Sequence, residues 1–142
     1  MRESRKGLIG SMVTVGSALL FVLVPTRVQA GIEQVQLSQA KSAAEADAET
    51  PEGKKFGEAL AQAFGREHGS TIQRCAKDAK RPDLSNFDLL LRLDATGAVD
   101  QAIEDPATAL ASCVREKMSG WKVATPPHAG FWVKVDVNLK PK

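Results

Sequence analysis

The sequence NFDLLLRLDATGAV, at residues 86–99, combines a strand pattern with a turn pattern. Apolar and other side chains alternate along it, which is typical of a β-strand with one buried face. The apolar set on that face is Phe87, Leu89, Leu91 and Leu93. Asp94 and Gly97 then stand at the first and fourth positions of a type I turn, and a weaker alternation continues from Val99 to Ile103. The stretch therefore predicts a β-hairpin.

The same turn resembles the Asp-Thr-Gly loop of aspartic proteases, with Ala95 inserted after Asp94. That chemistry needs Asp followed directly by Thr or Ser and then Gly, because the turn aims the carboxylate at a second, equivalent Asp. Ala95 breaks this spacing, and no second Asp-Thr-Gly occurs in the sequence. A homodimer could supply the second carboxylate, but ordinary turn chemistry at Asp94 and Gly97 accounts for the pattern, and we favour the hairpin.

Amphipathic helices are expected on both sides of the hairpin. The first opens at Thr50-Pro51-Glu52, with the Thr as cap and the Pro at the first helical position, and it ends before Pro82. His68-Gly69 is a weak point within it. The second helix is expected to start at Asp105-Pro106, with the Asp as cap, and to carry Cys113 on its apolar stripe.

The most regular alternation closes the chain, in FWVKVDVNL at residues 131–139. Its apolar side chains face a core, and the opposite side carries Trp132, Lys134, Asp136 and Asn138. Each amphipathic element must bury one side, so the elements predict an α+β fold of the order α-β-β-α-β. We expect a small antiparallel three-stranded sheet with two helices packed on one face.

The chain begins like an export signal. Residues 1–30 combine a basic start, an uncharged apolar run at residues 8–24 and a small-residue cleavage site at residues 28–30. An uncleaved membrane anchor is the alternative, because the run just reaches the lower limit for a spanning helix. Residues 31–50 are expected to form a flexible tether. The folded domain is then expected at residues 51–142.

The net charge of the chain limits the classes of binding partner that it favours. The chain carries 19 basic and 17 acidic side chains, and residues 1–30 hold four of the basic and one of the acidic ones, so the remainder has a net charge of −1. Nothing in that balance favours nucleic acid or an anionic membrane as a partner.

The two cysteines are expected to form one disulfide. An exported chain enters an oxidising compartment, where Cys75 and Cys113 would be oxidised.

Patterns typical of catalytic or ligand-binding sites are not found in the sequence. His68 and His128 are the only histidines, and neither has the spacing of a zinc or haem site. Asp94 and Asp100 flank the hairpin, where paired carboxylates are more often a solvated face than an acid–base couple. No phosphate-binding glycine loop occurs. We therefore expect neither an enzyme nor a cofactor or metal site.

Residues 70–139 resemble the TonB C-terminal domain, in particular its cysteine-containing branch at the ends of myxobacterial gliding proteins of the AgmX/PglI type. The shared pattern is Cys75, Pro82-x-Leu84, Asp94-x-x-Gly97-x-Val99, Cys113-Val114, Met118, Trp121-x-Val123 and Gly130. Ala76 and Ser85-Asn86 depart from it, where the family usually has an aromatic residue and a glycine. Val123-Ala124 departs as well, where the family usually has Phe-Pro.

The resemblance implies a non-catalytic periplasmic or secreted domain that binds bacterial envelope proteins. The last strand is expected at or near a sheet edge, where it could accept a strand from a partner peptide or from a second copy, as a homodimer. Trp132, Lys134, Asp136 and Asn138 would then lie beside the added strand. The alternatives are a small secreted hydrolase or inhibitor, and a short TonB-like energy transducer. Membrane contact is expected only in the last case, through an uncleaved N-terminal segment.

Overall fold

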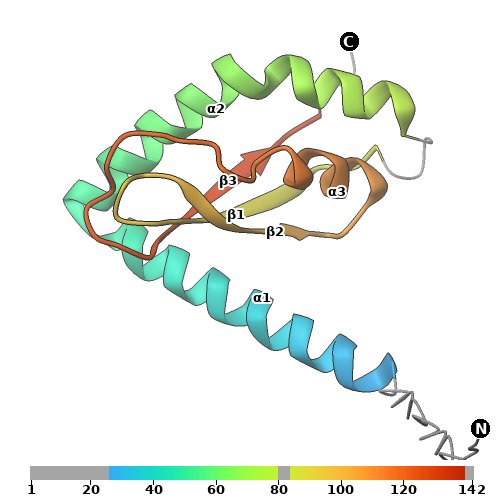
Figure 1. Ribbon diagram of the computed structural model, residues 1–142, viewed down its shortest axis with the longest axis horizontal. Helices are drawn as coiled ribbons and strands as arrows, with labels where there is room; N and C mark the ends of the chain where they lie inside the picture. The colour runs from blue at the N-terminus through green and yellow to red at the C-terminus, as the bar shows by residue number, and fades with distance from the viewer. Residues whose placement is uncertain (1–25, 80–83, 140–142) are drawn as a thin grey trace, which may run out of the picture.

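A computed structural model describes residues 26–79 and 84–139 of the 142-residue chain (Figure 1). The elements are α1 (Thr26–Glu49), α2 (Pro51–Asp78), β1 (Phe87–Leu93), β2 (Val99–Asp105), α3 (Ala109–Glu116) and β3 (Phe131–Val137). The expected export signal lies outside the described residues, except for residues 26–30 at the start of α1. No helix in the described ranges is both long enough and apolar enough to cross a membrane.

The three strands form one antiparallel sheet in the order β2-β1-β3. β1 lies in the centre, with Leu91 opposite Ala102 of β2 on one side and Val133 of β3 on the other. The predicted α+β class and three-stranded antiparallel sheet are therefore confirmed. Among the described strands, β3 pairs with β1 alone, so it forms one edge of the sheet, as expected. β2 forms the other edge.

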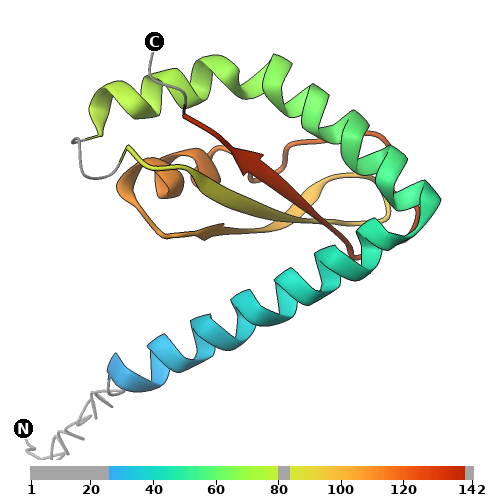
Figure 2. The same ribbon diagram turned by 180° about the vertical axis from the view of Figure 1, so that it is seen from behind.

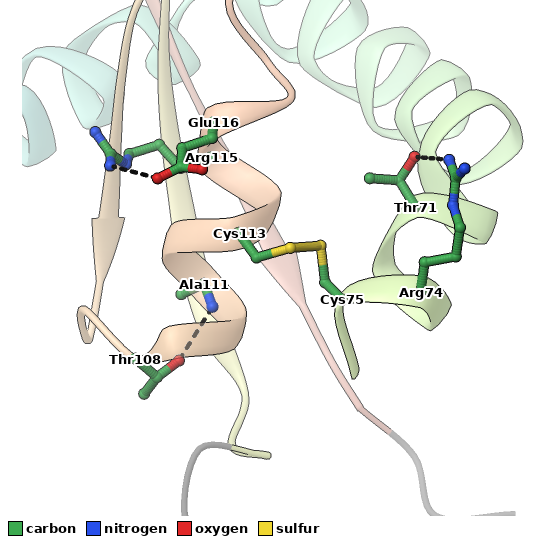
Figure 3. The surroundings of a disulfide bond; sticks show 8 residues. All are labelled: Thr71, Arg74, Cys75, Thr108, Ala111, Cys113, Arg115 and Glu116. Carbon is green, nitrogen blue, oxygen red and sulfur yellow. Dashed lines mark hydrogen bonds and ion pairs between the residues drawn. A yellow bond between two sulfur atoms is a disulfide. The ribbon is translucent and has the colours of Figure 1, made fainter. Parts of the chain in front are cut away.

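One face of the sheet is covered by α2 and α3, the two helices that the sequence predicts (Figure 1). The fully buried side chains of this core include Leu89, Leu91, Leu93, Leu110, Val114 and Met118. The predicted disulfide is present on the same side: it joins Cys75 of α2 to Cys113 of α3 (Figure 3). The two helices are thus linked covalently as well as through the core.

The turn between β1 and β2 is held by the side chain of Asp94. Its Oδ1 accepts hydrogen bonds from the Thr96 N–H at 2.8 Å, the Thr96 hydroxyl at 2.7 Å and the Ala98 N–H at 3.0 Å. The Thr96 hydroxyl and these backbone donors hold the pKa of Asp94 below its usual range. Gly97 has a positive φ of 87°. The carboxylate is therefore occupied within its own turn.

The start of α3 differs from the sequence expectation. Thr108 caps the helix, with its Oγ1 accepting from the Ala111 N–H at 3.1 Å (Figure 3). Asp105 does not act as the cap, because it remains in β2 opposite Asp88 and its carboxylate pairs with Lys41 of α1. The helix therefore begins at Ala109, after the strand has ended.

α2 also differs from the sequence expectation, because the helix continues without a break through the weak point at His68-Gly69. The His68 ring packs edge-on against Trp121, with ring centroids 4.6 Å apart, and it also lies beside Phe64. This contact with the body of the protein offsets the low helix propensity of the adjacent glycine. Burial lowers the pKa of His68, as expected for a ring held against apolar neighbours.

α1 covers the opposite face of the sheet, in contrast to the flexible tether expected at residues 31–50 (Figure 2). Ala40 and Ala44 are buried against Leu90 of β1, and Trp132 of β3 packs beside them. Because alanine side chains are short, α1 approaches the sheet closely enough to bury Leu90 completely. The folded unit therefore includes α1. The alanines give little amphipathic signal, which is why the sequence indicated a tether.

Candidate binding groove along the β3 edge

β3 presents unpaired backbone groups at the free edge of the sheet. The Trp132 N–H donates to Asp47 Oδ2 at 2.7 Å, so it points away from β1. Backbone groups alternate between the two sides of a strand, and those of Lys134 and Asp136 therefore point to the same free side. Within the described residues, no strand pairs with this side of β3. An edge of this kind can accept an additional strand.

The free edge lies in a groove between α1 and α2, which diverge on its two sides (Figure 2). The groove has a volume of about 410 Å³, and residues 131–134 of β3 form its floor. Small residues face it from both helices: Ala44 and Ala48 from α1, and Gly53 and Gly57 from α2. These short side chains leave space above the backbone edge. The longer side chains of Lys41, Glu45, Lys54 and Glu58 also line the groove.

The corner between α1 and α2 closes one end of the groove. Thr50 caps α2 there, with its Oγ1 accepting from the Gly53 N–H at 3.0 Å. Gly53 is buried, and a β-carbon at this position would overlap the carbonyl oxygen of Asp47. Glycine is therefore required at position 53 for α1 and α2 to meet at this angle.

Three charged side chains gather on the α1 side of the sheet. Lys134 Nζ lies 2.9 Å from Asp136 Oδ1 and 3.8 Å from Asp88 Oδ2. Asp136 stands directly opposite Asp88 in the register of β1 and β3, so two carboxylates face each other. Partial burial and the neighbouring Asp136 raise the pKa of Asp88, whereas the Lys134 ammonium lowers the pKa of Asp136. The Lys134 ammonium therefore interacts with both carboxylates.

Asp47 joins the closed end of the groove to the loop before β3. Its Oδ2 accepts from the Trp132 N–H, and its Oδ1 lies 2.8 Å from His128 Nε2. The Ala129 carbonyl, 3.0 Å from Nδ1, and the Asp47 carboxylate raise the pKa of His128. The sequence does not predict the contact between Asp47 and His128. They are 81 positions apart, and no local spacing connects them.

We expect the contact of α1 with this loop to weaken as the pH rises. The folded protein holds the His128 proton more tightly than the unfolded chain, so the ion pair stabilises the fold fully below the unfolded pKa of about 6.5. The contribution is lost as the pH rises through the folded pKa. Thermal unfolding between about pH 5 and 9 should show the native chain more stable than His128→Gln only on the acid side. An equal difference at every pH would contradict this.

Only some of the residues predicted to bind a partner lie along the groove. Trp132 and Lys134 line the groove, and Asp136 follows on the same edge. Trp132 is half-buried beneath α1, so it is not free on an open face. Asn138 is exposed just after the end of β3. The predicted turn at Asp94–Gly97 belongs to the β1–β2 hairpin and does not line the groove.

The arrangement of the described side chains does not support a metal site. In the part of the chain that the structure describes, no three His, Cys, Asp or Glu side chains are placed to hold a metal ion. Comparison with protein-family models, with curated proteins and with solved structures finds no match to this chain. The resemblance to the TonB C-terminal domain therefore rests on the spacing of the residues alone.

Proposed function

We propose that this protein is a non-catalytic binding module that takes up an extended segment of a partner protein as an additional strand on β3. The observation that carries the proposal is the unpaired backbone of Lys134 and Asp136 beside a groove with small side chains on both walls. A partner segment would extend the sheet by one strand, with main-chain hydrogen bonds to both residues.

Side chains of an added strand would alternate between the two walls. Those directed to the α2 side would lie next to Phe131 and Val133, which are buried apolar residues at the groove floor. Those directed to the α1 side would meet Lys41 and Glu45, which carry opposite charges. Lys54 and Glu58 of α2 also line the groove, beside this apolar floor. The preferred segment is therefore apolar at every second position, where it meets Phe131 and Val133, and polar or charged between.

An exported protein with a partner in the bacterial envelope fits these features. The Cys75–Cys113 disulfide is typical of an oxidising compartment, such as the periplasm or the outside of the cell. The signal pattern of residues 1–30 and the resemblance to the TonB C-terminal domain support the same location. We therefore place the partner among envelope proteins.

The decisive comparison is between Lys134→Pro and Lys134→Ala in the full chain. Both remove the lysine charge, but only proline removes the N–H that points to the free edge. We expect a partner captured from envelope extract by the native chain to be retained by Lys134→Ala and lost with Lys134→Pro. Circular dichroism must first show that both variants are folded.

Asp136→Pro and Asp136→Ala form a second pair, should Lys134→Pro fail to fold. Val135→Pro is unsuitable, because the backbone of Val135 faces β1 and the substitution would break the sheet itself. Equal capture by a folded proline variant and its alanine counterpart would contradict strand addition. The partner would then have to bind through side chains.

A further inference from the structure

We propose that a second copy of this chain occupies the groove in the resting state, with the two β3 strands paired antiparallel about a two-fold axis at Val135. The inference concerns the same edge as the proposed function. A dimer of this kind would close the edge to other strands until the two copies separate. The register of β3 against itself and the charges along this strand favour such a dimer.

The free edge of β3 is complementary to itself in one register. With Val135 opposite Val135 of the second copy, Lys134 stands opposite Asp136 of that copy, and Asp136 opposite its Lys134. The backbone groups of both residues point to the free side, so each of these pairs exchanges its N–H···O bonds. Trp132 can keep its bond to Asp47. Opposite charges therefore meet twice in one symmetric contact.

The apolar face of β3 fits the same register. Val133 would lie opposite Val137 of the second copy, and Val135 opposite its counterpart, on the side of the sheet that faces α2. Valine pairs of this kind stabilise adjacent strands. The two three-stranded sheets would become one continuous sheet.

Neighbouring registers and the other sheet edge are less favourable. A shift that centres the axis on Lys134 or on Asp136 places like charges directly opposite each other, which is destabilising. β2 carries Asp100, Glu104 and Asp105 and no basic residue, so its self-pairing would also bring like charges together. Charge complementarity therefore favours pairing through β3 over pairing through β2, and it favours the register centred on Val135.

Asp136 has both an acidic and a basic neighbour within a single copy. It faces Asp88 across the sheet, and Lys134 must neutralise both acids. In the dimer, Asp136 gains the lysine of the second copy as a direct neighbour.

Sedimentation equilibrium of the full chain, over a concentration series, tests the dimer directly. We expect Lys134→Asp and Asp136→Lys each to weaken dimerisation by about tenfold or more, because each places like charges opposite one another twice. The double variant Lys134→Asp/Asp136→Lys restores both pairs, so its dimerisation should return to near the native value. Lys122→Asp, an exposed change of the same charge near the β1–β2 hairpin, should leave it unaltered.

Asp136→Lys separates association from folding. It gives Asp88 an opposite charge as its direct neighbour but removes the ion pair of Asp136 with Lys134, so these two effects oppose each other within one copy. Circular dichroism should therefore show a folded variant whose dimer dissociates. A monomer at all concentrations would overturn the dimer. Single and double variants that dimerise as the native chain does would overturn this register. Neither result bears on capture of a partner by Lys134→Ala, so the proposed function is tested separately.

Discussion

Replacing both Cys75 and Cys113 by alanine is expected to lower the free energy of unfolding by about 4 kcal/mol. The bridge closes a loop with a sequence separation of 38, and its removal returns that conformational freedom to the unfolded chain. A small domain is stable by only about 5–15 kcal/mol, so the loss is a large share of the total. Urea unfolding of the full chain, followed by circular dichroism, measures it.

Reduction provides the matched control for this prediction. A reducing agent should destabilise the native chain by about the same amount and leave the double alanine variant unchanged. Agreement between the two losses shows that the cross-link, rather than the volume of the buried Cys75 side chain, is responsible. A loss below about 1 kcal/mol in both cases would show that α2 and α3 are held together by the core alone.

Gly97→Ala is expected to destabilise the protein by about 3 kcal/mol or more. Gly97 has a positive φ of 87°, and a β-carbon there would lie 2.5 Å from the carbonyl oxygen of Val123 and 2.6 Å from that of Ala124. Both contacts are with backbone. The Val123 N–H also donates to the Gly97 carbonyl at 2.9 Å, which keeps the two segments close. The turn must therefore distort or lose this contact.

Gly120→Ala is the control for the backbone conformation at Gly97. Gly120 also has a positive φ, of 73°, but a β-carbon there would meet nothing within 4 Å. Its substitution should cost only the left-handed backbone term of about 1–2 kcal/mol. The difference in urea unfolding between the two variants measures the steric contact. Equal losses would show that the Val123–Ala124 segment moves freely away from the turn.

The hairpin and the last strand could be predicted because their side chains alternate with a period of two. Phe87, Leu89 and Leu91 are buried on one face as the pattern indicates. The α2 cap could also be predicted, because Thr50 followed by proline is a strong local signal. These features depend on neighbours in the sequence, and local patterns describe such neighbours well.

Features that depend on distant contacts could not be predicted in this way. Asp105 and Thr108 are both capping residue types, and which of them caps α3 depends on how far β2 stays paired with β1. α1 is held by Ala40 and Ala44, whose contact with the sheet requires only that they be small. The Asp47 end of the groove also depends on distant contacts, because Asp47 of α1 binds the loop before β3 and the start of β3.

The alanines of α1 have an evolutionary consequence. They set the distance between helix and sheet, and Ala44 also lines the groove, so the width of the groove depends on residues outside β3. A larger side chain at Ala40 or Ala44 would move the helix without altering the hydrogen-bonding edge. Descendants of this chain could thus diverge in the side chains they accept while retaining the same way of holding a strand. Selection for a new partner would then act first on a helix that makes no backbone hydrogen bond to that partner.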